Sequence, residues 1–277
     1  MTAALPWPGP ARTGPPRTGS IVLTVFGDAI LPRGGEIALP SLLGLMARLG
    51  ASDGVVRTAL SRLTAEGWLD RTRAGRTSFY RLAPRGIRES TAATPLIYGP
   101  LDRVWGGRLR IVLADTGTDR AALDGSGYAL LAPGVLVALD SAPAPADALH
   151  VLTDAPQATL QAIAARAWPL DGLAAAYANF TARFSTVQGA ALWPPCDAIA
   201  LRLMVIHEYR RLALRDPRLP AGLLPPGWPG HRAHRLFATL YAALGPASER
   251  WLDDVRNASG PLPRGPDPVG RFSGGGR

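Results

Sequence analysis

The sequence of 277 residues predicts a multidomain α+β protein, and three observations lead to this class. Residues 19–88 combine helix-type and strand-type hydrophobic patterns and end in a hairpin pattern. Residues 101–167 alternate short strand-type runs with short helical segments, whereas residues 168–258 are helical almost throughout. We therefore expect three domains over these ranges, between Pro- and Gly-rich disordered tails at 1–18 and 259–277.

The N-terminal domain is predicted to begin with a helix, a short strand and a second helix. Ser20 caps a helix that runs to Leu31 and stops at Pro32, because proline lacks the amide that a continuing helix needs. Residues 36–39, Glu-Ile-Ala-Leu, fit a short strand. Residues 40–49 fit a helix with proline in its first turn and a glycine after its last.

A third helix, capped by Ser52 and extending to Glu66, carries the most informative pattern in the chain. Its apolar residues recur at the spacing of one buried helical face: Val56, Ala59, Leu60 and Leu63. The opposite face carries two guanidinium groups and two hydroxyls: Arg57, Thr58, Ser61 and Arg62. These groups complement the phosphate oxygens and base acceptors of a DNA major groove. We therefore predict that this face contacts DNA, with a solvated helix surface as the alternative.

The segment after this helix predicts a hairpin with a basic turn. Strand-type residues at 67–71 and 77–82 flank a turn that contains Gly75. Arg73 and Arg76 lie on either side of this glycine, and we predict that they contact phosphate or the minor groove, since glycine lets the backbone approach the duplex. A hairpin whose charges only aid solubility is the alternative. Helix, strand, helix, helix and hairpin is the order of a winged helix-turn-helix domain.

The middle of the chain predicts a small α+β domain. Residues 84–100 are rich in Pro, Arg, Gly, Thr and Ala, and we expect a linker and docking segment there. Beyond it, four strands and two short helices are expected in sequence order: strand 109–114, helix 119–124, strands 128–131, 135–139 and 151–153, and helix 159–167. This alternation favours a ferredoxin-like unit.

The C-terminal part predicts a helical domain. Helices are expected at 173–185, 196–214, 231–244 and 249–257. A break at 216–220 and a rigid Pro-rich crossing at 224–230 separate the second helix from the third.

Charge and composition narrow the class of partner. The formal net charge is +9, and all 30 basic residues other than histidine are arginine. Residues 1–90 hold 12 Arg against 6 acidic residues, whereas residues 91–277 hold 18 against 15. The excess positive charge therefore lies mostly around the 52–66 helix, which favours nucleic acid over a membrane as the partner.

The single cysteine, Cys196, rules out an internal disulfide and fits a reducing compartment. We find no signal-peptide pattern and no apolar stretch long enough for a membrane span, so we expect a cytoplasmic protein.

Motifs of enzymes and metal sites are absent from the sequence. No Gly-rich phosphate loop, Ser/His/Asp signature or Cys/His zinc spacing occurs, so we expect no catalytic residues, no metal and no cofactor. Asp115 ends the first strand of the middle domain, a place where related ferredoxin-like endoribonucleases can bind a metal. A metal-dependent nuclease is therefore one alternative, although a lone carboxylate holds Mg²⁺ poorly. A DNA-binding adaptor that responds to no effector is another.

Four motifs in this order resemble the PaaX-type repressors of bacterial phenylacetate catabolism. The first is Phe-Gly-Asp-Ala-Ile-Leu-Pro-Arg-Gly-Gly-Glu at 26–36, and the second is 56–63 with Glu-Gly-Trp at 66–68. The third consists of Ile-His-Glu-Tyr-Arg-Arg at 206–211, the segment 215–220 and the Pro-rich segment 224–230. A weaker fourth motif is Ala167-Trp168 with Leu173, Tyr177 and Phe180.

This resemblance implies a homodimeric repressor of an aromatic-acid catabolic operon that binds a double-stranded DNA operator. It also implies release from DNA by an aryl-CoA thioester, typically phenylacetyl-CoA. His207, Arg210 and Arg211 are candidates for binding the anionic coenzyme A portion through charge-assisted hydrogen bonds. Trp168 and Tyr177 are candidates for holding the aryl group. The alternative for these residues is a structural helix and core aromatics.

Overall fold

A computed structural model describes residues 18–101, 103, 105–114, 123, 126–146, 148–187 and 193–273, and the fold is α+β. The chain forms two compact units. The first contains the described residues of Met1–Pro100, Asn179–Leu214 and Arg232–Arg277; the second contains those of Leu101–Ala178 and Arg215–His231. Each unit thus combines segments from more than one of the three domains expected from the sequence.

The first unit begins with helices that largely follow the expected order. These are α1 (Thr18–Val25), a π-helical turn η1 (Phe26–Ile30), a 3₁₀ turn η2 (Leu31–Arg33), α2 (Leu39–Arg48) and α3 (Asp53–Ala65), with strand β1 (Glu36–Ala38) before α2. The first helix starts two residues earlier than expected and widens at Phe26. Leu39 and Pro40 open α2, because proline suits the first helical turn, where its missing amide costs no hydrogen bond.

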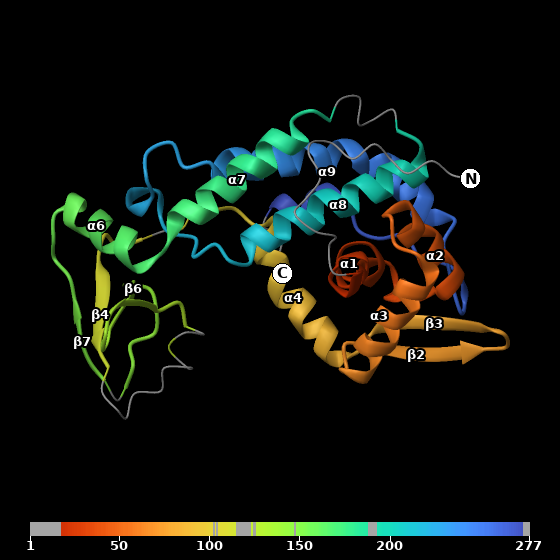
Figure 1. Ribbon diagram of the computed structural model, residues 1–277, viewed down its shortest axis with the longest axis horizontal. Helices are drawn as coiled ribbons and strands as arrows, with labels where there is room; N and C mark the ends of the chain where they lie inside the picture. The colour runs from red at the N-terminus through yellow and green to blue at the C-terminus, as the bar shows by residue number, and fades with distance from the viewer. Residues whose placement is uncertain are drawn as a thin grey trace. The chain divides into compact units, whose positions relative to one another are not determined.

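A three-stranded antiparallel sheet completes the N-terminal part of this unit. Its strand order is β1-β3-β2. Strands β2 (Leu69–Ala74) and β3 (Thr77–Leu82) lie side by side as a hairpin (Figure 1). The β2–β3 hairpin turns through Gly75 and Arg76, and Gly75 has a φ of 58°. Glycine suits this first turn position because a side chain there would be strained.

The segment 84–100 is a helix rather than the expected linker. Helix α4 covers Pro84–Tyr98, with Pro84 at its start and Pro95 in its last turn. Pro84 needs no hydrogen-bond partner at that position. The Gly99 amide donates to the Pro95 carbonyl at 3.2 Å and closes the helix.

Long helices and the chain end complete the first unit. Helix α8 covers Pro195–Ala213 and contacts α1, α2 and α4. Helix α9 covers Gly230–Asp253 without the break expected after residue 244, since the helix continues through Pro246. The expected disordered tail is likewise wrong for residues 259–273, which include strand β9 (Gly260–Pro261), paired with β8 (Arg256–Asn257), and the 3₁₀ segment η5 (Pro268–Ser273).

The second unit is built on a four-stranded antiparallel sheet with strand order β5-β6-β4-β7. Its elements are β4 (Leu109–Leu113), β5 (Ala129–Ala132), β6 (Val135–Leu139), β7 (Leu149–Leu152), α6 (Gln157–Ala167) and η4 (Ala221–Leu223). Alternate strand residues face opposite sides. Leu109 and Val137 pack with Leu160 of α6, whereas Val112 and Leu136 belong to a second cluster. Helix α7 (Leu170–Phe184) begins in this unit and ends in the first.

Several expectations concern residues outside those described. Asp115, the helix expected at 119–124 apart from Leu123, and residues 1–17 of the N-terminal tail are among them. No described helix is long and apolar enough to cross a membrane.

Candidate nucleic-acid interface

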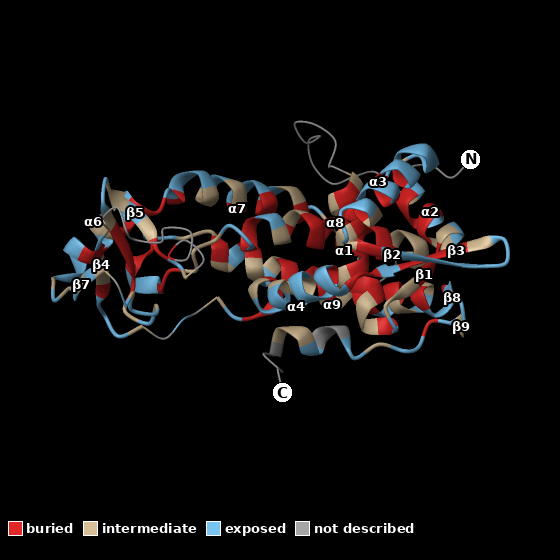
Figure 2. Cartoon of the chain, turned by 90° about the horizontal axis from the view of Figure 1, so that it is seen from below, coloured by how far each residue is buried: buried red, intermediate tan, exposed pale blue. Residues whose placement is uncertain are grey.

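Helix α3 has the two faces that its sequence predicts. Val56, Ala59, Leu60 and Leu63 are all buried, which confirms the predicted core face. Ser52 precedes the helix as expected, but its side chain makes no capping hydrogen bond; the Val56 amide instead donates to its carbonyl at 3.0 Å. The face opposite the core is exposed, as is most of the hairpin β2–β3 (Figure 2).

A groove of about 820 Å³ lies between α3, the start of α2 and the β2–β3 hairpin. Four arginines and no carboxylate are among the residues that line it: Leu39, Pro40, Leu43, Arg57, Ser61, Thr64, Ala65, Arg71, Arg73, Arg76, Thr77, Ser78 and Tyr80. Four of the six residues predicted to contact DNA therefore share one groove, namely Arg57, Ser61, Arg73 and Arg76. Such a surface attracts polyanions, because no acidic side chain within it offsets the guanidinium charges.

The groove arginines differ in how they are held. Arg57, Ser61 and Arg76 make no side-chain hydrogen bond or ion pair with any described residue, so their polar groups are available to a ligand. Arg73 donates from Nε to the Gly75 carbonyl at 3.2 Å. Arg71 donates from Nε and Nη2 to Ser78 Oγ at 3.2 and 2.9 Å, which fixes the plane of its guanidinium. Sequence reasoning placed Arg71 on the hairpin but did not select it as a contact residue.

The two other predicted contact residues do not line the groove. Thr58 donates its hydroxyl to the Gly54 carbonyl at 2.9 Å, one turn back along the same helix. Arg62 is exposed and lies 3.5 Å from Glu66, also on its own helix. An exposed pair of this kind is weak and leaves the guanidinium able to change partner.

Three of the candidate effector residues belong to α8 in the first unit. His207 is buried, with Nδ1 3.0 Å from Thr24 Oγ1. Arg210 donates to the same hydroxyl at 3.0 Å and to the Ser20 carbonyl at 3.3 Å. Burial lowers the pKa of Arg210 from its usual value. Arg211 is exposed and lies 3.9 Å from Glu208.

The two aromatic candidates belong to the second unit. Trp168 is part of the hydrophobic core around α6 and also lines a cavity of about 440 Å³ with Leu173 and Arg215. Tyr177 donates its hydroxyl to Asp216 at 2.8 Å, and its ring meets Trp228 edge-on at 6.0 Å. The cavity at Trp168 is lined by none of the four other effector candidates.

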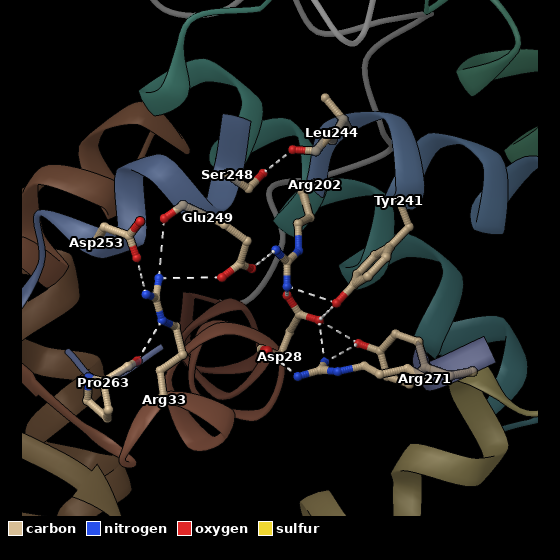
Figure 3. Close-up of polar contacts among 11 residues, drawn as sticks. Asp28, Arg33, Arg202, Tyr241, Leu244, Ser248, Glu249, Asp253, Pro263 and Arg271 are labelled. Atoms are coloured by element: carbon tan, nitrogen blue, oxygen red, sulfur yellow. Dashed lines mark hydrogen bonds and ion pairs between the residues drawn. The ribbon is translucent and has the colours of Figure 1, made fainter. Parts of the chain in front are cut away.

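A buried ionic cluster in the first unit is the main feature that sequence reasoning missed (Figure 3). Asp28, in the π-helical turn η1, is 1 % exposed and meets Arg202 of α8 at 3.0 Å and Arg271 of η5 at 2.9 Å. Tyr98 and Tyr241 donate their hydroxyls to the same carboxylate at 2.7 and 2.9 Å. One carboxylate thus joins elements from the start, middle and end of the chain.

Opposing effects act on the ionisation of this carboxyl group. Burial raises the pKa of Asp28, but the two guanidiniums and the two tyrosine hydroxyls lower it. The net result is a pKa below the usual value, so the group is a carboxylate at neutral pH.

A second branch of the cluster extends to α9. Glu249 accepts from Arg202 at 2.7 Å and pairs with Arg33 at 3.4 Å. Arg33 also pairs with Asp253. The sequence signal was available only in part, since Asp28 and Arg33 fall within the 26–36 motif while their charged partners lie more than 170 residues away.

Among the described residues, no group of three or more His, Cys, Asp or Glu side chains could hold a metal ion. Asp115, the residue on which the nuclease alternative depends, lies outside them.

Comparisons with known proteins agree with the motifs. Residues 17–86 match the family model for PaaX-like protein, and residues 168–254 match that for PaaX-like protein C-terminal domain. The chain is 32 % identical over 272 residues to the transcriptional repressor PaaX of Escherichia coli K12, covering 88 % of this chain and 86 % of that protein. An uncharacterized protein of Mycobacterium tuberculosis shares the fold, with a TM-score of 0.55 at 24 % identity over 84 % of this chain and 97 % of that one.

Proposed function

The chain belongs to the PaaX-like protein family, and from this premise we propose that it is a DNA-binding transcriptional repressor of an aromatic-acid catabolic operon of the phenylacetate type. The similar curated protein is a transcriptional repressor and not an enzyme, in line with the expectation of a non-enzymatic regulator. The observation that carries the proposal is the groove with four arginines and no carboxylate beside the exposed face of α3.

Within this proposal, α1–α3 and the three-stranded sheet form a winged helix-turn-helix domain. Helix α3 enters the major groove, and the β2–β3 hairpin is the wing that reaches the adjacent backbone or minor groove. Strand order β5-β6-β4-β7 with antiparallel neighbours supports a ferredoxin-like assignment for the second unit.

Arg57 and Ser61 are the proposed base-reading or phosphate-binding groups of α3, since their polar atoms have no described partner in the protein. Arg73 and Arg76 of the hairpin are proposed to bind phosphate. Arginine suits both tasks because its planar guanidinium can donate two parallel hydrogen bonds to guanine or to phosphate oxygens. Thr58 and Arg62 are proposed as secondary contacts at the edge of this surface.

The DNA-binding proposal is tested by fluorescence anisotropy on the DNA upstream of the protein's own gene. Arg57→Ala is expected to weaken specific binding by about 1–3 kcal/mol, or roughly tenfold to a hundredfold, with an unchanged thermal midpoint. The matched control is Arg232→Ala, which removes an exposed helical arginine of α9 outside the groove. Equal loss in both variants, or no loss in Arg57→Ala, would contradict the assignment of α3.

We further propose a homodimer that binds two operator half-sites and is released by an aryl-CoA thioester such as phenylacetyl-CoA. His207, Arg210, Arg211, Trp168 and Tyr177 stay predictions as effector contacts. A gel shift titrated with phenylacetyl-CoA beside free phenylacetate tests this step. Release by no thioester would remove the proposed induction and leave the DNA binding intact.

A further inference from the structure

A second cavity in the first unit lies apart from the arginine-lined groove. It has a volume of about 270 Å³ and is formed by α1, the π-helical turn η1, α4 and α8. Apolar side chains from three of these helices line it, among them Leu23, Ala93, Ile97, Ile206 and Leu214. One guanidinium, that of Arg210, is the basic group at this cavity.

Arg210 has no acidic partner among the described residues. Its side chain donates hydrogen bonds to two neutral oxygens, the Ser20 carbonyl and Thr24 Oγ1. Burial lowers its pKa, and no carboxylate contributes in the opposite direction. Arg210 is partly buried, and a partly buried charge without a counter-ion is unfavourable, which makes the position suitable for an anion.

The two acids at this cavity do not neutralise Arg210. Asp28 is held by Arg202 and Arg271 at 3.0 and 2.9 Å. Glu89 is exposed on α4 and makes no ion pair with a described residue. The positive charge of the Arg210 guanidinium therefore stays available to an anionic ligand.

The volume sets how large a group the cavity can enclose, and one side of the cavity is open to solvent. A water molecule takes roughly 30 Å³ of the liquid, so the cavity holds the equivalent of about nine waters, or a ligand of about ten non-hydrogen atoms. A coenzyme thioester is far larger and has a neutral carbonyl where a free acid has a carboxylate. The cavity thus encloses a compact acid, whereas most of a coenzyme thioester would lie outside it.

We infer that this cavity binds a small apolar carboxylate, with a ring among the apolar side chains and its carboxylate paired with Arg210. Arg210 is also one of the predicted coenzyme A contacts, and the inference assigns its guanidinium to a small acid instead. The cavity lies against α1, which packs on α3: a Cβ on Gly19 would fall 2.8 Å from Arg62 Nη2 and 3.8 Å from Leu63.

Isothermal titration calorimetry of the full chain with phenylacetate tests the inference. Wild-type protein is expected to bind one equivalent saturably at millimolar or lower concentration. Phenylacetamide, which has the same shape without the charge, is expected to bind at least about tenfold more weakly. This comparison needs no variant, so it is independent of folding defects.

Two variants and a control complete the test. Arg210→Ala is expected to weaken phenylacetate binding by about tenfold or more, and Ala93→Trp to abolish it by filling the cavity from α4. Arg232→Ala removes an exposed arginine of α9 that does not line the cavity, and should change binding by less than about twofold. Circular dichroism verifies that each variant is folded.

Three results would overturn the inference: no saturable binding by folded wild-type protein, equal affinity for the amide, or full binding by folded Arg210→Ala. Competition between phenylacetyl-CoA and phenylacetate that depends on Arg210 would also overturn it, because the cavity would then hold the acyl end of the proposed effector. That outcome leaves the proposed repressor function standing. If thioesters fail to release the protein from DNA, the inference that the free acid binds in this cavity is unaffected.

Discussion

Replacing Asp28 by asparagine keeps the shape of the side chain but removes the charge at the centre of the buried ionic cluster. The carboxylate is 1 % exposed, Arg202 is 2 % exposed and Arg271 is 14 % exposed. In Asp28→Asn, the two guanidiniums would face a neutral amide and each other. Glu249 would still compensate Arg202, but Arg271 makes no ion pair with another described carboxylate.

The expected cost is about 3–5 kcal/mol, the range for removing one partner of a buried ion pair. The upper half of this range is reached only if Arg271 stays buried, because an η5 segment that detaches would return its guanidinium to water. Even the lower value is a large share of a total stability of about 5–15 kcal/mol. The variant is therefore expected to fold with a clearly lower free energy of unfolding.

Urea unfolding followed by circular dichroism measures this difference. Asp254→Asn is the matched control, since Asp254 is exposed and makes no side-chain ion pair or hydrogen bond with a described residue; its effect should stay within about 0.5 kcal/mol. A decrease for Asp28→Asn no larger than that of the control would refute the reasoning.

The same experiment has a pH dependence with a defined sign. The folded pKa of Asp28 lies below its unfolded value, so its contribution is complete above the unfolded pKa and is lost as the pH falls through the folded pKa. Wild-type protein should therefore lose stability in acid more steeply than Asp28→Asn. Parallel curves for the two proteins would contradict the assigned ionisation.

Three further predictions concern other parts of the first unit. Truncation after Asp267 removes Arg271 and should lower the free energy of unfolding by about 2–3 kcal/mol. An unchanged urea midpoint would show that η5 does not contribute to stability. Gly75→Ala places a side chain at a φ of 58° and should destabilise the hairpin by about 1 kcal/mol, measured by hydrogen exchange; equal protection would contradict the turn geometry. The double variant Arg73→Ala/Arg76→Ala should lower the slope of log affinity against log salt by about 2, and an identical slope would exclude phosphate contacts by both residues.

Helix α3 and the hairpin could be predicted from sequence because their signals are local. A repeat of apolar residues at helical spacing determines which face of α3 is buried, and a glycine between two strand-type runs determines the turn. Once these two elements are adjacent, the exposed face of one and the basic turn of the other line the same groove. The clustering of Arg57 and Arg76 was therefore predictable without knowledge of the rest of the fold.

Helices α4 and α9 show where local signals mislead. Proline opens α4 and also lies in its last turn, both positions that a helix tolerates, yet the composition of the segment resembles a linker. In α9, Gly245 and Pro246 have the character of a helix end, but the helix continues to Asp253. Packing against other helices outweighs these local preferences, and that packing is not visible in the segment itself.

The ionic cluster could not be predicted because its members are distant in sequence. Asp28 needs Arg202 and Arg271, which are 174 and 243 residues further along the chain. The sequence offers 30 arginines as possible partners, and nothing in their local patterns distinguishes these two. The cavity at Arg210 escaped prediction for the same reason, since three separate helices form it.

The contact between Arg271 and Asp28 has a consequence for how the protein is made. Arg271 donates both to the Asp28 carboxylate and to its backbone carbonyl, so a residue made 243 positions later completes the surroundings of Asp28. During translation, the helices that carry the proposed DNA-reading residues emerge long before this partner exists. We expect the newly made N-terminal part to stay incompletely packed until Arg271 has been synthesised. Prematurely terminated products should therefore be proteolysed rather than compete with the intact protein for DNA.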